Sequence, residues 1–309
     1  MIFEDFKRFE DIETEMLDNY VNFEIKRKKR VIKNPRTAMM VNPLKLKHLN
    51  NIDNLKADIV ILNLEDGVEE SKKKRALKLI KVFLSHLKSS TSMVVVRVNP
   101  LELGGKEEIL ELNDINPDAI RVSKIENKDE VGASLSLIKP HIDIHLSLET
   151  KEALENLKTL RFSSRVTTLY VGMLDLLNSF ELSQAIMTPD NPVINYLLSK
   201  ILIEAKMVNF VVVGLTFQDY HNTEAFRKWA MRLKEIGYCG ISCIGPKQVD
   251  IAHEIFNVSK EEIKRAKSIK ESFERHKKNG ISGFMHSEYG FIDDPIYKDA
   301  LLILDSDIN

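Results

Sequence analysis

The chain has 309 residues, of which 45 are Lys or Arg and 46 are Asp or Glu, so its formal charge is −1. Apolar residues make up 43% and charged residues 29%, which is typical of a soluble globular protein and excludes disorder of the whole chain. The charge balance argues against a duplex nucleic acid as partner, because such proteins carry a net basic domain or a clustered basic face. No apolar run approaches 18 residues, so we expect neither a membrane-spanning helix nor a membrane partner.

The sequence favours a cytoplasmic location. Its first residues alternate charged and aromatic side chains and lack the apolar core of a signal peptide. Cys239 and Cys243 are the only cysteines, which excludes a disulfide framework and fits a reducing compartment.

Residues 1–35 predict an N-terminal helical extension that ends in a basic run, residues 26–30. Such a run can bind nucleic acid or a membrane surface, but few charges cluster here and no aromatic residue lies among them. We therefore interpret it as the solvated end of a helix that precedes the main domain.

Short apolar runs recur after this extension and alternate with amphipathic stretches of helical length. The expected strands are residues 37–41, 58–64, 93–98, 119–122, 142–148, 168–171, 209–214 and 240–244, and the clearest expected helices are 71–88, 128–139, 150–163, 191–207 and 225–236. Continuous apolar runs suit parallel strands that are covered on both faces. Eight such units in about 220 residues predict an α/β fold of the (β/α)8 TIM-barrel type over residues 36–257, with a doubly wound open sheet as the alternative.

Ionic side chains lie at the carboxyl ends of several expected strands. They are Glu65 and Asp66, Arg97, Lys124, Glu149 and Asp175. In a barrel these ends meet at one mouth, where the catalytic groups gather. Of these residues, Arg97 gives the strongest indication of a functional site, because a charged residue inside an apolar strand must be paired if it is buried.

The acidic residues at this mouth would repel one another unless a cation lay among them. Mg²⁺ fits such a site, since it takes a few carboxylates and leaves positions open for water and substrate oxygens. Zinc fits poorly, because there is no Cys/His cluster and His145 is the only histidine in any expected strand.

Six motifs in order along the chain resemble the citrate lyase beta-subunit-like family, also called the HpcH/HpaI aldolase/citrate lyase family. They are RTAMMVNP at 36–43, LNLEDGV at 62–68, RVN at 97–99, LET at 148–150, VGMLDL at 171–176 and, near the end, GFIDDP at 290–295. The resemblance implies a TIM barrel that catalyses the cleavage or formation of a carbon–carbon bond.

The resemblance also implies roles for individual residues. Glu149 and Asp175 would be the Mg²⁺ ligands, and Arg97 would bind the carboxylate or carbonyl oxygen of a 2-oxo acid. Arg36 and Glu65 would support the substrate or metal-bound water, with Asp66 behind them. Lys124 would act as an electrostatic group near the substrate, since this chemistry needs no Schiff base.

In the thioester lyases of this family, the segment that GFIDDP resembles supplies a catalytic Asp to a neighbouring subunit. Asp293 would then be the general acid or base that exchanges the α-proton of the acyl group. Residues 258–309, including a charged amphipathic helix at 261–278, would form an arm that reaches the next subunit. We expect a closed homo-oligomer, with a trimer favoured by the resemblance.

Several positions depart from the family pattern and mark a divergent member. Asn63 replaces an Asp, Asn42-Pro43 replaces Pro-Gly, Ser123 replaces the Pro before Lys124, and Gly245 replaces a His. None removes an expected metal ligand, and three alternatives stay open for the acyl carrier: coenzyme A, an acyl-carrier protein or none.

Three functional hypotheses remain open from the sequence. The first is a Mg²⁺-dependent lyase or aldolase that acts through an enolate on a 3-hydroxy acid, as a thioester or a free acid. The second is a thioesterase that acts on malyl- or citramalyl-type thioesters. The third is a non-catalytic barrel subunit, with Asn63 and Gly245 as signs of decay.

Overall fold

The computed structural model describes residues 6–24 and 27–306, so the first five residues of the predicted extension and Lys26 of the basic run lie outside the described residues. The chain divides into two compact units, Met1–Ile255 and Phe256–Asn309. Each unit is described separately.

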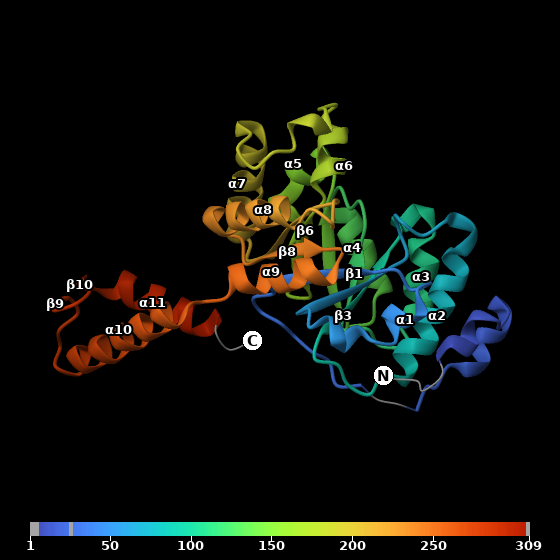
Figure 1. Ribbon diagram of the computed structural model, residues 1–309, viewed down its shortest axis with the longest axis horizontal. Coiled ribbons are helices and arrows are strands. Elements are labelled where there is room, and N and C mark those ends of the chain that lie inside the picture. Colours follow the sequence, from blue (N-terminus) through green and yellow to red (C-terminus); the bar gives the residue numbers. More distant parts are fainter. Residues whose placement is uncertain (1–5, 25–26, 307–309) are drawn as a thin grey trace. The chain divides into compact units, whose positions relative to one another are not determined.

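The first unit is a closed barrel of parallel strands, shown in Figure 1. Its strands are β1 Thr37–Val41, β2 Ile59–Asn63, β3 Met93–Val98, β4 Ala119–Val122, β5 Asp143–Leu148, β6 Val166–Val171, β7 Val211–Thr216 and β8 Gly240–Cys243. Each strand pairs with the next, and β8 pairs with β1. The predicted barrel is confirmed, and closure between β8 and β1 excludes the open sheet.

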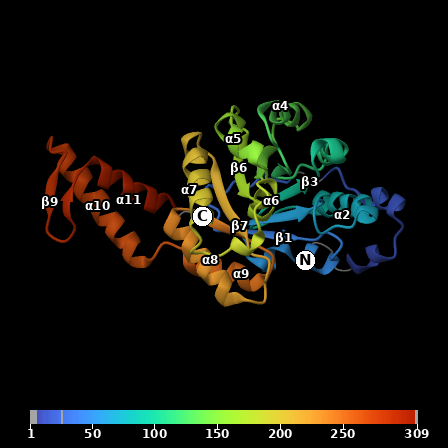
Figure 2. The ribbon, with the colours of Figure 1, turned by 90° about the horizontal axis from the view of Figure 1, so that it is seen from above.

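Helices follow the strands and surround them, as Figure 2 shows from above. The α-helices of this part are α1 Leu46–Leu49, α2 Lys73–His86, α3 Gly105–Leu112, α4 Lys128–Leu137, α5 Lys151–Leu160, α6 Met173–Ser179, α7 Pro192–Met207, α8 Thr223–Ile236 and α9 Pro246–Phe256. Short 3₁₀ helices are η3 Ile52–Leu55, η4 Glu70–Lys72, η5 Leu101–Leu103 and η6 Gln184–Ile186. Within the described residues, no helix is long and apolar enough to cross a membrane.

An apolar layer fills the part of the barrel interior that lies on the amino-end side of the mouth. Its members are Ala38, Ile59, Ile61, Met93, Val95, Ala119, Tyr170 and Val213, all nearly inaccessible to solvent. These residues come from six strands and can meet only inside the barrel. Because side chains alternate along a strand, the next inward-facing position of each strand lies two residues further toward the mouth.

The N-terminal extension contains helical segments, as predicted, and the structure shows their type. Its described helices are 3₁₀ helices, η1 Phe6–Glu10 and η2 Thr14–Tyr20. Arg75 of α2 holds this segment, since its guanidinium donates to the carbonyl oxygens of Phe9, Glu10 and Ile12. The segment is thus fixed by contacts with the barrel helices rather than by its own α-helical hydrogen bonds.

The basic run is not the solvated helix end that we predicted. Residues 27–30 have no regular structure, and Arg27 forms an ion pair with Asp118. The backbone N–H of Arg30 donates to the same carboxylate, and Lys29 lies 2.7 Å from Asp143. The basic side chains therefore neutralise acidic groups at the amino ends of β4 and β5.

The second unit consists of a helical hairpin and a small antiparallel sheet. Its elements are α10 Lys260–Lys278, β9 Phe284–His286, β10 Gly290–Ile292 and α11 Asp294–Ser306. A capping box formed by Ser259 and Glu262 begins α10. Ile269 and Phe273 of α10 pack in a small core with Ile292 and Ala300.

Candidate active site

Two arginines lie inside the barrel, in the layer above the apolar core. Arg97 lies two residues beyond Val95, and Arg121 lies two residues beyond Ala119, so both point inward. Strand register places Asn63 opposite Arg97 and Arg97 opposite Arg121. The inner wall of the mouth is therefore polar, although each strand is apolar along most of its length.

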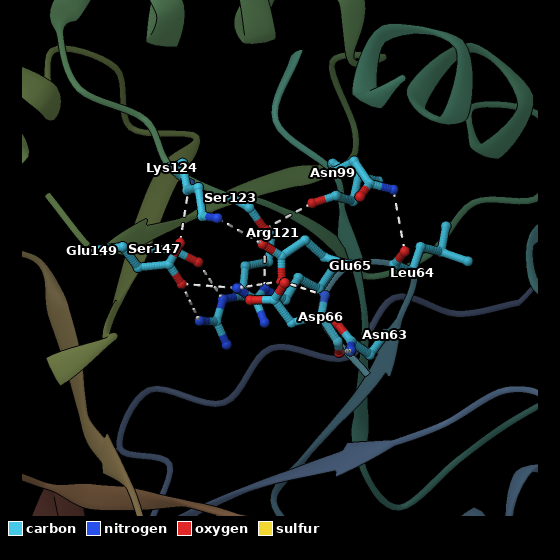
Figure 3. Close-up of polar contacts among 12 residues, drawn as sticks. Asn63, Leu64, Glu65, Asp66, Asn99, Arg121, Ser123, Lys124, Ser147 and Glu149 are labelled. Atoms are coloured by element: carbon cyan, nitrogen blue, oxygen red, sulfur yellow. Dashed lines mark hydrogen bonds and ion pairs between the residues drawn. The ribbon is translucent and has the colours of Figure 1, made fainter. Parts of the chain in front are cut away.

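Arg97 joins two carboxylates that follow different strands, Glu65 and Glu149. Both glutamates are labelled in Figure 3. Its Nη2 lies 2.8 Å from Glu65 Oε2 and 2.9 Å from Glu149 Oε1. Its Nε donates to the hydroxyl of Ser123, which in turn donates to the carbonyl oxygen of Val98. All three ionic groups are nearly inaccessible to solvent, so the paired state expected for a buried Arg97 is what the structure contains.

Glu149 is held in place by the backbone as well as by arginine. Its Oε2 accepts a hydrogen bond of 3.3 Å from the backbone N–H of Lys124, which has a left-handed conformation with φ of 52°. Gly172 approaches the side chain so closely that a Cβ atom there would lie 2.4 Å from Glu149 Cγ. The position of this carboxylate is therefore determined on three sides.

Glu65 follows β2 and differs electrostatically from Glu149. Burial raises its pKa to about 7, against the opposing effect of Arg97. Its Oε2 accepts a hydrogen bond from the backbone N–H of Asp66, and its Oε1 lies 3.7 Å from Lys124 Nζ. Glu65 can therefore exist with or without a proton near neutral pH.

Arg121 is a site residue that our sequence analysis did not single out. Its Nε donates to Ser147 over 2.7 Å, and its Nη2 lies 3.6 Å from Glu149 Oε1. Its guanidinium carbon lies 4.3 Å from the centre of the Tyr170 ring. Burial lowers its pKa to about 10, with Arg97 acting in the same direction. The signal that identified Arg97, a charged residue within an apolar strand, also applies to Arg121 in its strand.

A cavity of about 280 Å³ opens at this mouth. Its lining includes Arg97, Arg121, Glu149, Asp66 and Asp175. Asp175 lies in the first turn of α6, and burial raises the pKa of its carboxyl group, with Glu149 and Asp66 acting in the same direction. The carboxylates thus face one another across a confined space.

The donor set fits Mg²⁺ better than other metals. Within the described residues, no group of three or more His, Cys, Asp or Glu side chains is spaced to enclose a metal ion, as a structural zinc site requires. Mg²⁺ needs only one or two protein carboxylates and otherwise binds water and substrate. A cation between Glu149 and Asp175 would relieve the repulsion that raises the pKa of Asp175.

Arg36 does not lie with the other predicted site residues. It precedes β1, and its Nε and Nη2 bind Asp58, which precedes β2, over 3.0 and 2.8 Å. This ion pair lies at the amino ends of the strands, opposite the mouth that contains Arg97. The predicted support of substrate by Arg36 is corrected accordingly, because parallel strands put residues before and after a strand at opposite ends of the barrel.

Asp293 belongs to the second compact unit. It precedes α11, and its Oδ1 accepts a hydrogen bond of 3.3 Å from the backbone N–H of Ile296. The side chain therefore caps the first turn of this helix.

Two departures from the family pattern have structural counterparts. Ser123 supplies the hydroxyl that holds Arg97 Nε. Gln248, which follows Gly245, accepts a hydrogen bond from the backbone N–H of Ile244 and donates to the carbonyl oxygen of Phe217. Gln248 thereby connects the loops after β7 and β8, and its backbone N–H donates to the carbonyl oxygen of Gly245 over 3.0 Å.

Comparison with known proteins shows the family to which the chain belongs. The family model described as HpcH/HpaI aldolase/citrate lyase matches residues 36–246. A (3S)-malyl-CoA thioesterase of Cereibacter sphaeroides is 25% identical over 246 residues, which is 79% of this chain and 85% of the relative. The mitochondrial citramalyl-CoA lyase of Rattus norvegicus is 26% identical over 285 residues, with coverage of 86% and 84%. The citrate lyase subunit beta of Haemophilus influenzae is 25% identical over 271 residues, with coverage of 83% and 91%.

Solved structures share the fold. A citrate lyase from Burkholderia xenovorans aligns with a TM-score of 0.75 at 18% identity, covering 89% of this chain and 92% of the other. Protein CitE from Mycobacterium tuberculosis, in complex with magnesium, acetoacetate and coenzyme A, aligns with a TM-score of 0.71 at 18% identity, covering 90% and 100%.

Proposed function

The chain belongs to the HpcH/HpaI aldolase/citrate lyase family and is a carbon–carbon lyase by class, and from this premise we propose that it is a Mg²⁺-dependent lyase of 3-hydroxy acids or their thioesters. The reaction would release or consume a 2-oxo acid through an enolate. The observation that carries the proposal is the buried Arg97 shared by Glu65 and Glu149, with Asp175 lining the same cavity. The third hypothesis, a non-catalytic barrel, is not retained, because the family and the reported relatives are enzymes.

Glu149 and Asp175 are the proposed Mg²⁺ ligands. When bound, the ion would supply Lewis acidity at the carbonyl oxygen of the 2-oxo acid. Lys124 N–H, Arg97 and Gly172 fix the carboxylate of Glu149, so this ligand does not have to reorganise when the ion enters.

Arg97 is proposed to orient the substrate carboxylate. Its hydrogen bonds use Nε and Nη2, which leaves Nη1 without a partner among the described residues. A charge-assisted hydrogen bond from Nη1 would place the carboxylate above the Glu65–Arg97–Glu149 group. Lys124 would add a positive charge at the rim, and Asp66 would hold water or metal-bound groups beside Glu65.

Asp293 remains the proposed acid or base for the acyl α-proton. We propose that residues 258–309 form an arm that brings Asp293 to the mouth of a neighbouring subunit, in a closed homo-oligomer that is a trimer. Light scattering on the purified protein tests the assembly, and a strict monomer would remove this role from Asp293. Cys239 and Cys243 are free thiols, which supports the proposed cytoplasmic location.

The metal role is tested with Glu149→Gln and Asp175→Asn. We expect each variant to weaken Mg²⁺ binding in a calorimetric titration by about tenfold or more, and to reduce turnover of malyl- and citramalyl-type thioesters. Glu155→Gln, an exposed position on α5, is the matched control and should leave both quantities unchanged. Unchanged Mg²⁺ affinity and turnover in both site variants would refute the proposal.

A thioesterase is the second candidate function, since the thioesterase relative is as similar to this chain as the lyases are. The two activities differ in their products. A lyase yields a free 2-oxo acid and a shorter thioester, whereas a thioesterase yields the free hydroxy acid and a thiol. Product analysis with malyl-CoA and citramalyl-CoA, and with the corresponding free acids, therefore decides between them and shows whether coenzyme A is part of the substrate.

A further inference from the structure

Unpaired polar atoms are concentrated in one layer of the barrel interior. Asn63 Oδ1, Arg121 Nη1 and His145 Nε2 are buried and have no hydrogen-bond partner among the described residues. Across neighbouring strands, Asn63 is paired with Arg97, Arg97 with Arg121, and Arg121 with His145. The three unpaired atoms therefore belong to the same layer of the barrel interior. Asn63 and Arg121 line the cavity at the mouth, and His145 does not.

A buried donor or acceptor without a partner is costly, so its presence in a cavity wall indicates a group that a ligand completes. The amide of Asn63 is oriented by its Nδ2, which donates to the carbonyl oxygen of Asp66. Its Oδ1 is therefore an acceptor. Arg121 Nη1 can only donate. Besides Arg97 Nη1, the cavity thus offers one unpaired acceptor, Asn63 Oδ1, and a second unpaired cationic donor, Arg121 Nη1.

We propose that Arg121 binds a second carboxylate of the substrate, so that the site takes dicarboxylic oxo and hydroxy acids in preference to monocarboxylic ones. This inference rests on the proposed function and names the substrate class of the same site. Arg97 Nη1 would bind the first carboxylate, next to the reacting carbon, and Arg121 Nη1 would bind the second.

The guanidinium of Arg121 is held so that only Nη1 remains available. Ser147 accepts from Nε, Glu149 lies 3.6 Å from Nη2, and the ring of Tyr170 lies against the plane of the group. A donor fixed in this way loses little conformational freedom when it binds an anion.

Asp66 and Asp175 also line the cavity, but the carboxylates that contact the two arginines balance the charge of those arginines only in part. Arg97 and Arg121 carry two positive charges, and the buried carboxylates in contact with them are Glu65 and Glu149. Burial raises the pKa of Glu65 to about 7, so its negative charge is incomplete at neutral pH. Asn63 Oδ1 would repel a carboxylate and would accept from a substrate hydroxyl, which directs the second carboxylate toward Arg121 rather than toward β2.

L-Malate and L-lactate test the proposal, since they differ only in the second carboxylate and neither decarboxylates during a titration. Binding is measured by calorimetry with the full-length protein in MgCl₂. We expect the unmodified protein to bind malate about tenfold or more tightly than lactate. In Arg121→Met, malate affinity should fall to that of lactate, while lactate affinity stays the same.

Arg161→Met is the matched control. Arg161 also lies beside an aromatic ring, that of Phe210, but it binds the carbonyl oxygens of Val166 and Val208 at the amino ends of β6 and β7. This variant should keep the full malate preference. Arg121→Lys and Ser147→Ala are milder changes for use if Arg121→Met does not fold, and each should weaken malate binding severalfold and lactate binding not at all.

Three results would overturn the inference. They are equal affinity of the unmodified protein for malate and lactate, no binding of either acid, and equal weakening of both acids in the Arg121 or Ser147 variants. None of these measurements uses turnover. A protein that cleaves carbon–carbon bonds without preferring malate therefore loses only this inference, and one that prefers malate without lyase activity loses only the proposed function.

Discussion

Arg97 on β3 donates from Nη2 to Glu149 Oε1 across 2.9 Å, although the two residues lie 52 positions apart and β4 runs between their strands. The same nitrogen contacts Glu65, so two buried carboxylates share one cation. Removal of Arg97 leaves the two carboxylates without their shared counter-charge in a site with little solvent, so we expect substitutions at this contact to destabilise the protein strongly.

Arg97→Met is expected to destabilise the protein by about 3–5 kcal/mol at neutral pH, because it leaves two buried carboxylates without their shared partner. Urea unfolding measures this loss. The double variant Arg97→Met/Glu149→Gln removes one of the two unpaired buried charges and should recover part of the stability without any recovery of activity. A loss of less than about 1 kcal/mol in the single variant would contradict the pairing.

Gly172→Ala is expected to lower Mg²⁺ affinity by about tenfold, because the new Cβ would lie 2.4 Å from Glu149 Cγ and must displace that carboxylate. Calorimetry with MgCl₂ measures the effect. Gly132→Ala on α4 is the control, since its Cβ would meet only Phe162 Cζ at 4.0 Å. That change should stabilise the protein by about 0.5–1 kcal/mol and leave the metal affinity unaltered.

His145 should make the free energy of unfolding depend on pH. Burial lowers its pKa to about 3, with Arg121 acting in the same direction, whereas the unfolded chain has the ordinary pKa of 6.5. The unfolded state therefore binds the proton first, and this contribution to stability is complete above pH 6.5 and is lost as the pH falls toward 3. Between pH 6 and pH 4, unfolding in urea should show a loss of about 2 kcal/mol that is absent in His145→Gln. Parallel pH profiles for the two proteins would refute this role of His145.

Arg36→Gln should affect stability and not substrate. Its ion pair with Asp58 lies at the amino ends of the strands, with a quarter of the arginine side chain exposed. We expect a loss of about 1 kcal/mol in urea unfolding, with KM and kcat unchanged. An increase in KM with unchanged stability would instead support the binding role that the family resemblance implied.

The sequence alone was sufficient for the barrel and for most of its mouth. Apolar runs of strand length alternate with amphipathic helices, and the bounds of β1, β3 and β4 agree with the expected strands at both ends. Because parallel strands share one carboxyl end, residues that follow different strands, such as Glu65 and Glu149, could be predicted to meet. That inference requires only the order of the strands and the two-residue period of side chains along them.

The tertiary structure decided which of these residues are in contact and at which end of the barrel each basic side chain lies. Arg27 and Lys29 neutralise Asp118 and Asp143 only because the N-terminal segment crosses the amino ends of the strands. Arg121 reaches Glu149 only because β4 pairs with β5 in a register that places Arg121 opposite His145, four residues before Glu149. Local patterns along a chain specify the direction of a side chain relative to its own strand, whereas the partner of a buried charge depends on cross-strand register and on what else fills the interior. The residue types of the candidate active site are therefore determined by the sequence, and its ion pairs by the register of the strands in the closed barrel.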